Sequence, residues 1–173
     1  FSNSSSQLTS RFPLPASRLR LGNIMVRVRM ILLYDLAKAN NALVCGTENK
    51  SEYLLGYFTL WGDQAADFAP LQHLYKTQVR QLAQYLGVPK SIIDQPPTAG
   101  LWKGQTDEEE LGFSYKLADL ILYLKYDKDM DRDGILRLLL PQFPHIPHLP
   151  QVYDKVISRV HSNSFKHQIP YHL

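Results

Sequence analysis

The sequence predicts an α/β fold in which helices predominate. A short continuous apolar run, ALVCG at residues 42 to 46, ends at a glycine and is typical of a strand buried on both faces of a parallel sheet. A segment of helical periodicity precedes this run, and several amphipathic segments follow it. One strand cannot form a sheet. Partner strands must therefore come from sequence N-terminal to this chain or from extended segments that the pattern does not reveal.

Each element before residue 90 follows from a local pattern. Residues 1 to 21 are rich in serine, contain two prolines and show no steady period, which predicts a linker or tail. Apolar side chains recur at helical spacing from residue 23 to residue 40, where an asparagine pair favours a stop. Residues 75 to 87 form an amphipathic helical pattern that ends at a glycine, with Pro89 just beyond it.

The C-terminal half is predicted to consist of helices separated by loops. Residues 95 to 112 mix proline, glycine, threonine and acidic residues around Trp102 and indicate a long loop, which in a compact domain is often functional or mobile. Helices are predicted at residues 114 to 126, 134 to 140 and 151 to 161.

Composition narrows the class of protein. The 173 residues suit one domain or most of one, with 45% hydrophobic residues and a net charge of +3. This charge is far below that of a dedicated nucleic-acid binder. The single cysteine, Cys45, excludes an internal disulfide and favours a reducing compartment. No apolar run approaches the roughly 20 residues that span a bilayer. We therefore expect a cytoplasmic protein that binds neither nucleic acid nor membranes.

Polar residues stand directly after the predicted strand, at its carboxyl end. Ligands of open parallel sheets bind at such ends. Thr47 could hydrogen-bond a phosphate, ribose or base, and Glu48 or Glu52 could hold a hard cation such as Mg²⁺. Alternatively, residues 47 to 49 only cap a helix that begins near Lys50, and spacing alone favours this interpretation.

Basic residues offer a second candidate. Lys76 lies near the start of a predicted helix, where amide groups and the positive helix end favour an anion and an ammonium group suits phosphate. The alternative, which residue types alone favour, is an ordinary solvated lysine. Arg27 and Arg29 are two residues apart in a helix, so at most one of them faces a given ligand.

Two strings resemble metal sites only in part. DMDRDG at residues 129 to 134 begins like a calcium loop, but its twelfth position falls on Leu140 instead of a glutamate, which argues against calcium. His145 and His148 have no apparent third ligand, which argues against zinc.

Longer strings carry a more specific signal. Five strings closely resemble, in the correct order, the C-terminal part of NAD synthetases. They are GNIMVRVRMILLYDLA, ALVCGTENKSEYLLGYFTLWGD, LYKTQVRQLAQYLGVPKSIID, PPTAGLWKGQTDEEELG and FKHQIP. The domain prediction is therefore a tail at residues 1 to 21 and the C-terminal part of an NAD synthetase domain at residues 22 to 173. The resemblance implies an adenine-nucleotide α-hydrolase-like fold, a doubly wound parallel sheet that is incomplete here and therefore mostly helical.

The resemblance also implies a reaction. Members of this family generally form homodimers and use ATP and Mg²⁺ to adenylate the nicotinate carboxylate of deamido-NAD. Ammonia, free or from glutamine, then displaces AMP to give NAD. The implied ATP-binding residues are Thr47, Lys76 and Thr98, the implied deamido-NAD-binding residues are Arg27, Asp67 and Lys166, and the residue implied for Mg²⁺ is Glu52. No catalytic residue is assigned.

Two of these residues carry further expectations. Thr98 begins a loop, residues 97 to 112, that resembles a segment closing over the active site, where closure excludes water. Lys166 is expected to reach deamido-NAD across the dimer.

Departures from the family pattern leave alternatives open. Leu60 stands where many members have a lysine that contacts deamido-NAD, so that contact is absent or replaced. The Ser-Gly-Gly-x-Asp-Ser loop that cradles pyrophosphate is not among these 173 residues. TLWGDQAADF favours glutamine-dependent relatives and GLWKGQTDEEELG favours ammonia-dependent ones.

The main hypothesis is therefore that the chain is part of an active NAD synthetase. The alternative is a non-catalytic degenerate paralogue or partner subunit that keeps the dimer and dinucleotide surfaces. A different amide-forming ligase of the same class is disfavoured by Arg27, Asp67 and Lys166.

Overall fold

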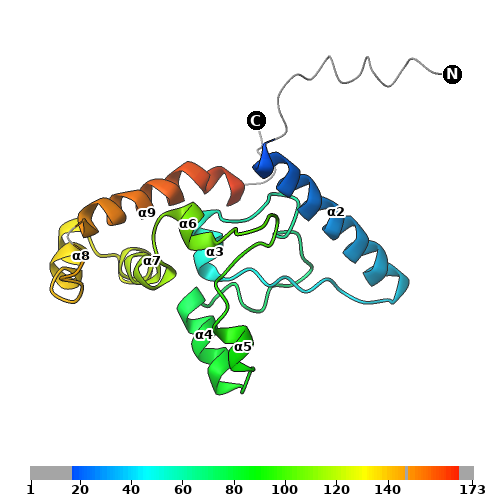
Figure 1. Ribbon diagram of the computed structural model, residues 1–173, viewed down its shortest axis with the longest axis horizontal. Helices are drawn as coiled ribbons and strands as arrows, with labels where there is room; N and C mark the ends of the chain where they lie inside the picture. Colours follow the sequence, from blue (N-terminus) through cyan, green and yellow to red (C-terminus); the bar gives the residue numbers. More distant parts are fainter. Residues whose placement is uncertain (1–16, 147, 168–173) are drawn as a thin grey trace, which may run out of the picture.

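Helices joined by loops make up the described part of the chain (Figure 1). The computed structural model describes residues 17–146 and 148–167, so most of the predicted N-terminal tail lies outside it. The helices are, in order, α2 (Arg18–Ala39), α3 (Lys50–Leu55), α4 (Lys76–Tyr85), α5 (Lys90–Ile93), α6 (Asp107–Leu111), α7 (Tyr115–Leu122), the π-helix η1 (Tyr123–Asp127), α8 (Arg132–Leu139), α9 (Leu149–Asn163) and the 3-10 helix η2 (Ser164–His167).

The prediction of a strand at residues 42 to 46 is wrong for the described part of the chain. Its place is taken by an extended segment with one isolated parallel bridge, between Cys45 and Phe68. Val44 is buried there, but the Leu43 side chain is 69% exposed. A strand buried on both faces needs neighbours at both edges and layers above and below it, and among residues 17–146 and 148–167 this segment forms a bridge with one neighbour only.

Helix α2 begins earlier than the pattern predicts. The side chain of Ser17 accepts a hydrogen bond from the Arg20 amide at 3.2 Å and caps the first turn. The helix therefore starts at Arg18 instead of Asn23, and residues 18–21 of the predicted tail belong to it. The predicted stop is confirmed, because Asn40 is the C-cap.

Apolar side chains surround most of α2. Only three of its residues are buried, namely Gly22, Val26 and Met30. The exposed large hydrophobic side chains on this helix are Leu19, Leu21, Ile24, Met25, Val28, Ile31, Leu32, Leu33, Tyr34 and Leu36. These apolar side chains are interspersed with charged residues of the same helix. No helix of the described residues is long and apolar enough to cross a membrane. Figure 1 places α2 and α8 at opposite ends of the molecule.

The hydrophobic core lies on the other side of the molecule, where α3, α4 and α9 pack against α7. Its fully buried side chains include Leu55, Ile121, Leu122, Ile135, Leu149 and Val156. Gly56, at φ +60°, ends α3 in the left-handed conformation, and a Cβ atom there would lie 2.3 Å from the Asn163 Cβ atom. Glycine thus allows the end of α9 to approach the end of α3.

The predicted long loop at residues 95 to 112 is only partly a loop. Helix α6 forms within it because the Thr106 side chain accepts a hydrogen bond from the Glu109 amide, and Gly112 ends the helix at φ +72°. The acids of its first turn interact favourably with the positive helix end.

The calcium-like string also has a local role. The Asp131 side chain caps α8 by accepting a hydrogen bond from the Gly134 amide at 2.8 Å. This cap makes the helix begin at Arg132, two residues before the predicted start.

A core truncation should separate buried from exposed positions. Ile121→Ala removes a fully buried side chain between α7 and its neighbours, and we expect a loss of about 2–5 kcal/mol in the free energy of unfolding. Leu138→Ala, at a position that is 44% exposed, should cost roughly 0.5 kcal/mol or less. Urea unfolding followed by circular dichroism measures both. Equal losses in the two variants would contradict the placement of the core.

Candidate functional site

A cavity of about 370 Å³ brings together residues that are far apart in the sequence. It is lined by Thr47, Glu48, Glu52, Tyr57, Phe58, Asp63, Lys76, Thr98, Ala99 and Asp107. Four of the seven predicted site residues, Thr47, Glu52, Lys76 and Thr98, are in this set. The structure thus gathers all the residues that were predicted for ATP and Mg²⁺ around one space.

Lys76 and Glu52 form an ion pair inside this cavity. The Lys76 Nζ atom lies 2.8 Å from Glu52 Oε1, and the two side chains are 22% and 16% exposed. The ammonium group also lies 5.4 Å from the centre of the Tyr115 ring. The interpretation of Lys76 as an ordinary solvated lysine is therefore wrong.

Capping and ligand binding use different atoms of the segment after Val44. Asn49 is the N-cap of α3 and accepts a hydrogen bond from the Glu52 amide, while Glu52 Oε2 accepts one from the Asn49 amide. The capping prediction for this segment is confirmed at Asn49. Glu52 nevertheless directs its other oxygen at Lys76, and Thr47 lines the cavity.

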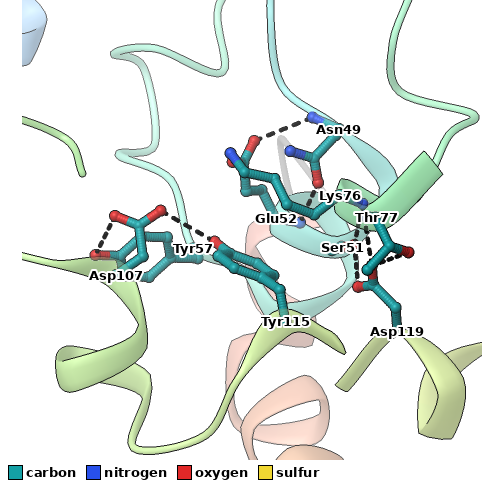
Figure 2. A network of polar contacts seen from close by, with 9 residues as sticks. All are labelled: Asn49, Ser51, Glu52, Tyr57, Lys76, Thr77, Asp107, Tyr115 and Asp119. Atoms are coloured by element: carbon teal, nitrogen blue, oxygen red, sulfur yellow. Dashed lines mark hydrogen bonds and ion pairs between the residues drawn. The ribbon is translucent and has the colours of Figure 1, made fainter. Parts of the chain in front are cut away.

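The start of α4 is held by side chains of two other helices (Figure 2). The Lys76 amide donates to Ser51 Oγ at 2.8 Å, and the Thr77 amide donates to Asp119 Oδ2 at 2.8 Å. Both amide groups were expected to be available to an anionic ligand. They are already engaged, so Lys76 offers a ligand its ammonium group and not its amide.

The acidic residue Asp107 ties α6 to the cavity wall. Its carboxylate accepts hydrogen bonds from the hydroxyl groups of Tyr57 and Tyr115 at 3.3 and 3.2 Å, and burial raises its pKa (Figure 2). The Asp107 amide donates to the Pro97 carbonyl at 2.9 Å. This bond joins the two ends of the loop that carries Thr98 and holds that loop beside the cavity.

A larger cavity of about 600 Å³ adjoins the first. It lies between the start of α2, the loop after α3, residues 99 to 105 and the end of α9, and the two cavities share Tyr57, Phe58, Asp63 and Ala99. Lys166, which was predicted to contact deamido-NAD, lines it. Its Nζ atom donates to the carbonyls of Gly56 and Phe58 at 2.7 and 2.8 Å.

The other two residues predicted for deamido-NAD lie outside both cavities. Arg27 Nε donates to the Leu60 carbonyl at 3.1 Å. Asp67 Oδ2 accepts a hydrogen bond from the Val44 amide at 2.7 Å and steadies the extended segment. At position 60, where many family members have a lysine, the backbone carbonyl thus binds an arginine.

Glu48 is the least satisfied acid of the smaller cavity. It is 9% exposed, its Oε1 atom has no hydrogen-bond partner, and burial, followed by the charges of Glu52 and Asp63, raises its pKa to about 8. Such oxygen donors suit Mg²⁺. Within the described residues, no three acidic, histidine or cysteine side chains could enclose a metal by themselves. Mg²⁺ usually takes only one or two carboxylates together with phosphate and water oxygens.

A family model confirms the resemblance seen in the sequence. The model described as NAD synthase matches residues 3–170. The chain belongs to the NAD synthase family. The match begins well before the predicted boundary at residue 22.

Curated members of the family are similar over part of their length. The NH(3)-dependent NAD(+) synthetase of Pyrococcus furiosus is 52% identical over 128 residues, which are 74% of this chain and 50% of that protein. The protein of the same name from Chlorobaculum tepidum is 46% identical over 155 residues, which are 90% and 53% of the two chains. The chain spans about half the length of these relatives.

Solved structures of the family share the fold. The NMN synthetase of Francisella tularensis superposes with a TM-score of 0.73, at 32% identity, over 97% of this chain and 61% of that one. The NH3-dependent NAD synthetase of Campylobacter jejuni, in complex with the nitrate ion, gives a TM-score of 0.69 at 32% identity, with the same coverage. The predicted fold class is thus confirmed at the level of the NAD synthetase fold and its mostly helical character here. The doubly wound sheet remains a prediction.

Glu48→Gln should remove a pH dependence of stability. The pKa of Glu48 is raised from 4.5 to about 8 in the folded protein, so between these values the folded state holds a proton that the unfolded chain releases. The stability of the natural protein should therefore fall as pH rises through this window, and the glutamine variant should lose that contribution.

Thermal unfolding at about pH 5, 7 and 9 tests this linkage. The melting temperature of the variant should rise relative to that of the natural protein as pH increases. Glu109→Gln, at an exposed position, is the matched control and should show no such trend. Parallel pH curves for Glu48→Gln and the natural protein would contradict the raised pKa.

Proposed function

We propose that this chain contributes the nucleotide-binding part of an NAD synthetase, which amidates deamido-NAD to NAD with ATP, Mg²⁺ and ammonia through an adenylated intermediate. The observation that carries the proposal is the convergence of Thr47, Glu52, Lys76 and Thr98 on one cavity. Membership in the family and the names of its curated relatives support the same reaction, with ammonia as the nitrogen donor.

The residues of the smaller cavity have the chemistry to bind a nucleoside triphosphate. The Lys76 ammonium group is positioned to bind phosphate oxygens, and a phosphate competes with Glu52 for it. The hydroxyl groups of Thr47 and Thr98 supply neutral donors. Glu52 would hold Mg²⁺, which neutralises charge on phosphate oxygens when it is bound.

The shared wall of the two cavities suits a reaction between two substrates. We place ATP in the smaller cavity and the nicotinate end of deamido-NAD in the larger one, so that they meet beside Tyr57 and Asp63. The nicotinate carboxylate oxygen attacks the α-phosphorus atom and pyrophosphate leaves. Ammonia then attacks the carbonyl carbon of the acyl-adenylate, AMP leaves, and the nitrogen loses a proton. Water would hydrolyse the acyl-adenylate, so the loop held by Asp107 protects it.

Lys166 places a half-buried positive charge beside the larger cavity, and the partial burial lowers its pKa. We assign it to deamido-NAD, together with Arg27 and Asp67, which would contact parts of the dinucleotide that extend beyond the cavity.

The apolar surface of α2 supports a homodimer, and the open edge at Cys45 supports a doubly wound parallel sheet in the complete domain. We place the reaction in the cytoplasm.

The sequence also left a second candidate function open, that of a non-catalytic paralogue or a partner subunit of a chain that carries the Ser-Gly-Gly-x-Asp-Ser loop of the family. A non-catalytic paralogue or partner subunit would bind deamido-NAD or assemble with a chain that carries this loop, and it would make no NAD by itself. Assay of the full protein encoded by the gene separates the two candidates, because only the enzyme forms NAD.

Lys76→Ala in the full encoded protein should weaken the use of ATP. A hydrogen bond to a charged group contributes about 1.5–3 kcal/mol, so we expect the KM for ATP to rise roughly 10- to 100-fold. Lys116→Ala, an exposed position on α7, is the matched control. Steady-state kinetics with ATP, deamido-NAD and ammonia measures both variants.

Unchanged ATP kinetics in Lys76→Ala would refute the ATP site. A parallel assay with nicotinate mononucleotide in place of deamido-NAD tests the acceptor, because one structural neighbour is named NMN synthetase. Preference for the mononucleotide would overturn the assignment of deamido-NAD and leave that of ATP intact.

A further inference from the structure

We propose that Asp119 is a positioning residue for the ATP site, which holds the first turn of α4 against α3 and thereby directs the ammonium group of Lys76 into the cavity. The inference rests on the proposed function of Lys76. Asp119 is in neither set of cavity-lining residues, so it acts through its neighbours.

The carboxylate of Asp119 is buried and fully engaged. The residue is 4% exposed and lies on α7. Its Oδ2 atom accepts hydrogen bonds from the Thr77 amide at 2.8 Å and from Thr77 Oγ1 at 2.7 Å, and its Oδ1 atom accepts one from Ser51 Oγ (Figure 2). The residue therefore joins α3, α4 and α7 through a single side chain.

Helix α4 needs this external partner because its own capping bond does not reach the amides of Lys76 and Thr77. The Gln78 side chain of α4 accepts a hydrogen bond only from the Tyr75 amide, at 2.9 Å. The first amide groups of a helix have no partner within the helix and are usually satisfied by a side chain at the N-cap. The N-cap of α4 is Tyr75, whose side chain makes no capping hydrogen bond. Asp119 and Ser51 satisfy the amides of Thr77 and Lys76 instead.

The same contacts fix both members of the ion pair. Ser51 precedes Glu52 in α3, and Thr77 follows Lys76 in α4. Because Ser51 Oγ donates to Asp119 and accepts from the Lys76 amide, the two helix starts cannot shift independently. The relative position of the Glu52 carboxylate and the Lys76 ammonium group thus depends on one buried carboxylate.

The charge of Asp119 suits this task more than a neutral side chain would. The residue sits between apolar neighbours of α7, including Ala118 and Leu122, and burial raises its pKa. The hydrogen bonds from Ser51 and Thr77 lower the pKa in turn. A carboxylate offers more acceptor positions than an amide side chain, and its negative charge is favourable at the positive end of α4.

A double-mutant cycle in the full encoded protein tests the inference. Asp119→Ala should raise the KM for ATP about tenfold, the order expected from one hydrogen bond to a charged group, and leave the KM for deamido-NAD unchanged. In the Lys76→Ala background the same substitution should have little further effect on the KM for ATP. Asp133→Ala, whose side chain is 80% exposed, is the control and should leave both constants unchanged.

A merely structural role would lower the melting temperature but would not produce this non-additivity. Equal effects of Asp119→Ala on the KM for ATP in the presence and absence of Lys76 would overturn the inference. If Lys76→Ala is impaired but Asp119→Ala has an unchanged KM for ATP, the inference about Asp119 is overturned and the proposed function of Lys76 stands. Unchanged ATP kinetics in Lys76→Ala would refute the proposed function first.

A milder pair of variants decides the question if Asp119→Ala does not fold. Thr77→Val removes one hydrogen bond to Asp119 at nearly constant volume, and Thr77→Ser keeps it. The valine variant should raise the KM for ATP about threefold, since the lost bond is one of three to Asp119, and the serine variant should restore it. Equal KM values for the two variants would contradict the inference.

Discussion

The hydrogen bonds to the buried carboxylate of Asp119 connect three helices that belong to distant parts of the sequence. They satisfy the Thr77 amide of α4 and orient the hydroxyl group of Ser51, which in turn accepts from the Lys76 amide. The ion pair between Lys76 and Glu52, and with it the shape of the smaller cavity, depends on this arrangement. The core on the far side of α7 supplies the rigidity, because Ile121 and Leu122 are completely buried on the same helix.

Sequence reasoning found residues that line the smaller cavity more readily than the residues that hold them in place. Thr47, Glu52, Lys76 and Thr98 stand in long strings shared with the family, and the structure gathers them around one cavity. Asp119 was missed, although an acid on the apolar face of a helix is itself a signal of a buried polar role. Asp107 and Tyr57 were missed because contacts between a loop and a distant helix leave no periodic pattern.

The elements were predictable where local chemistry decides them. The stop at Asn40 and the cap at Asn49 depend on neighbouring residues only, and both were found. The strand predicted at residues 42 to 46 does not form in the described part of the chain. A strand exists only with its partners, and an apolar run cannot show whether those partners are present. The early start of α2 depends on Ser17, which a serine-rich segment made hard to distinguish.

Two surfaces of the molecule remain without partners in the described residues, and they lie close in sequence. The apolar sides of α2 end near Asn40, and the open edge begins at Leu43, which is 69% exposed. Large exposed apolar patches typically mark sites of contact with another protein, a ligand or a membrane. The smaller cavity, in contrast, is lined by charged side chains, among them those of Glu52 and Lys76.

The edge at the bridge between Cys45 and Phe68 carries a side chain that a reagent can label. Cys45 is exposed and is the single cysteine of the sequence. A thiol-specific reagent would therefore attach to these 173 residues at one known place, two residues before Thr47. Its rate of attachment reports how far solvent reaches Cys45 and the edge of the extended segment beside it.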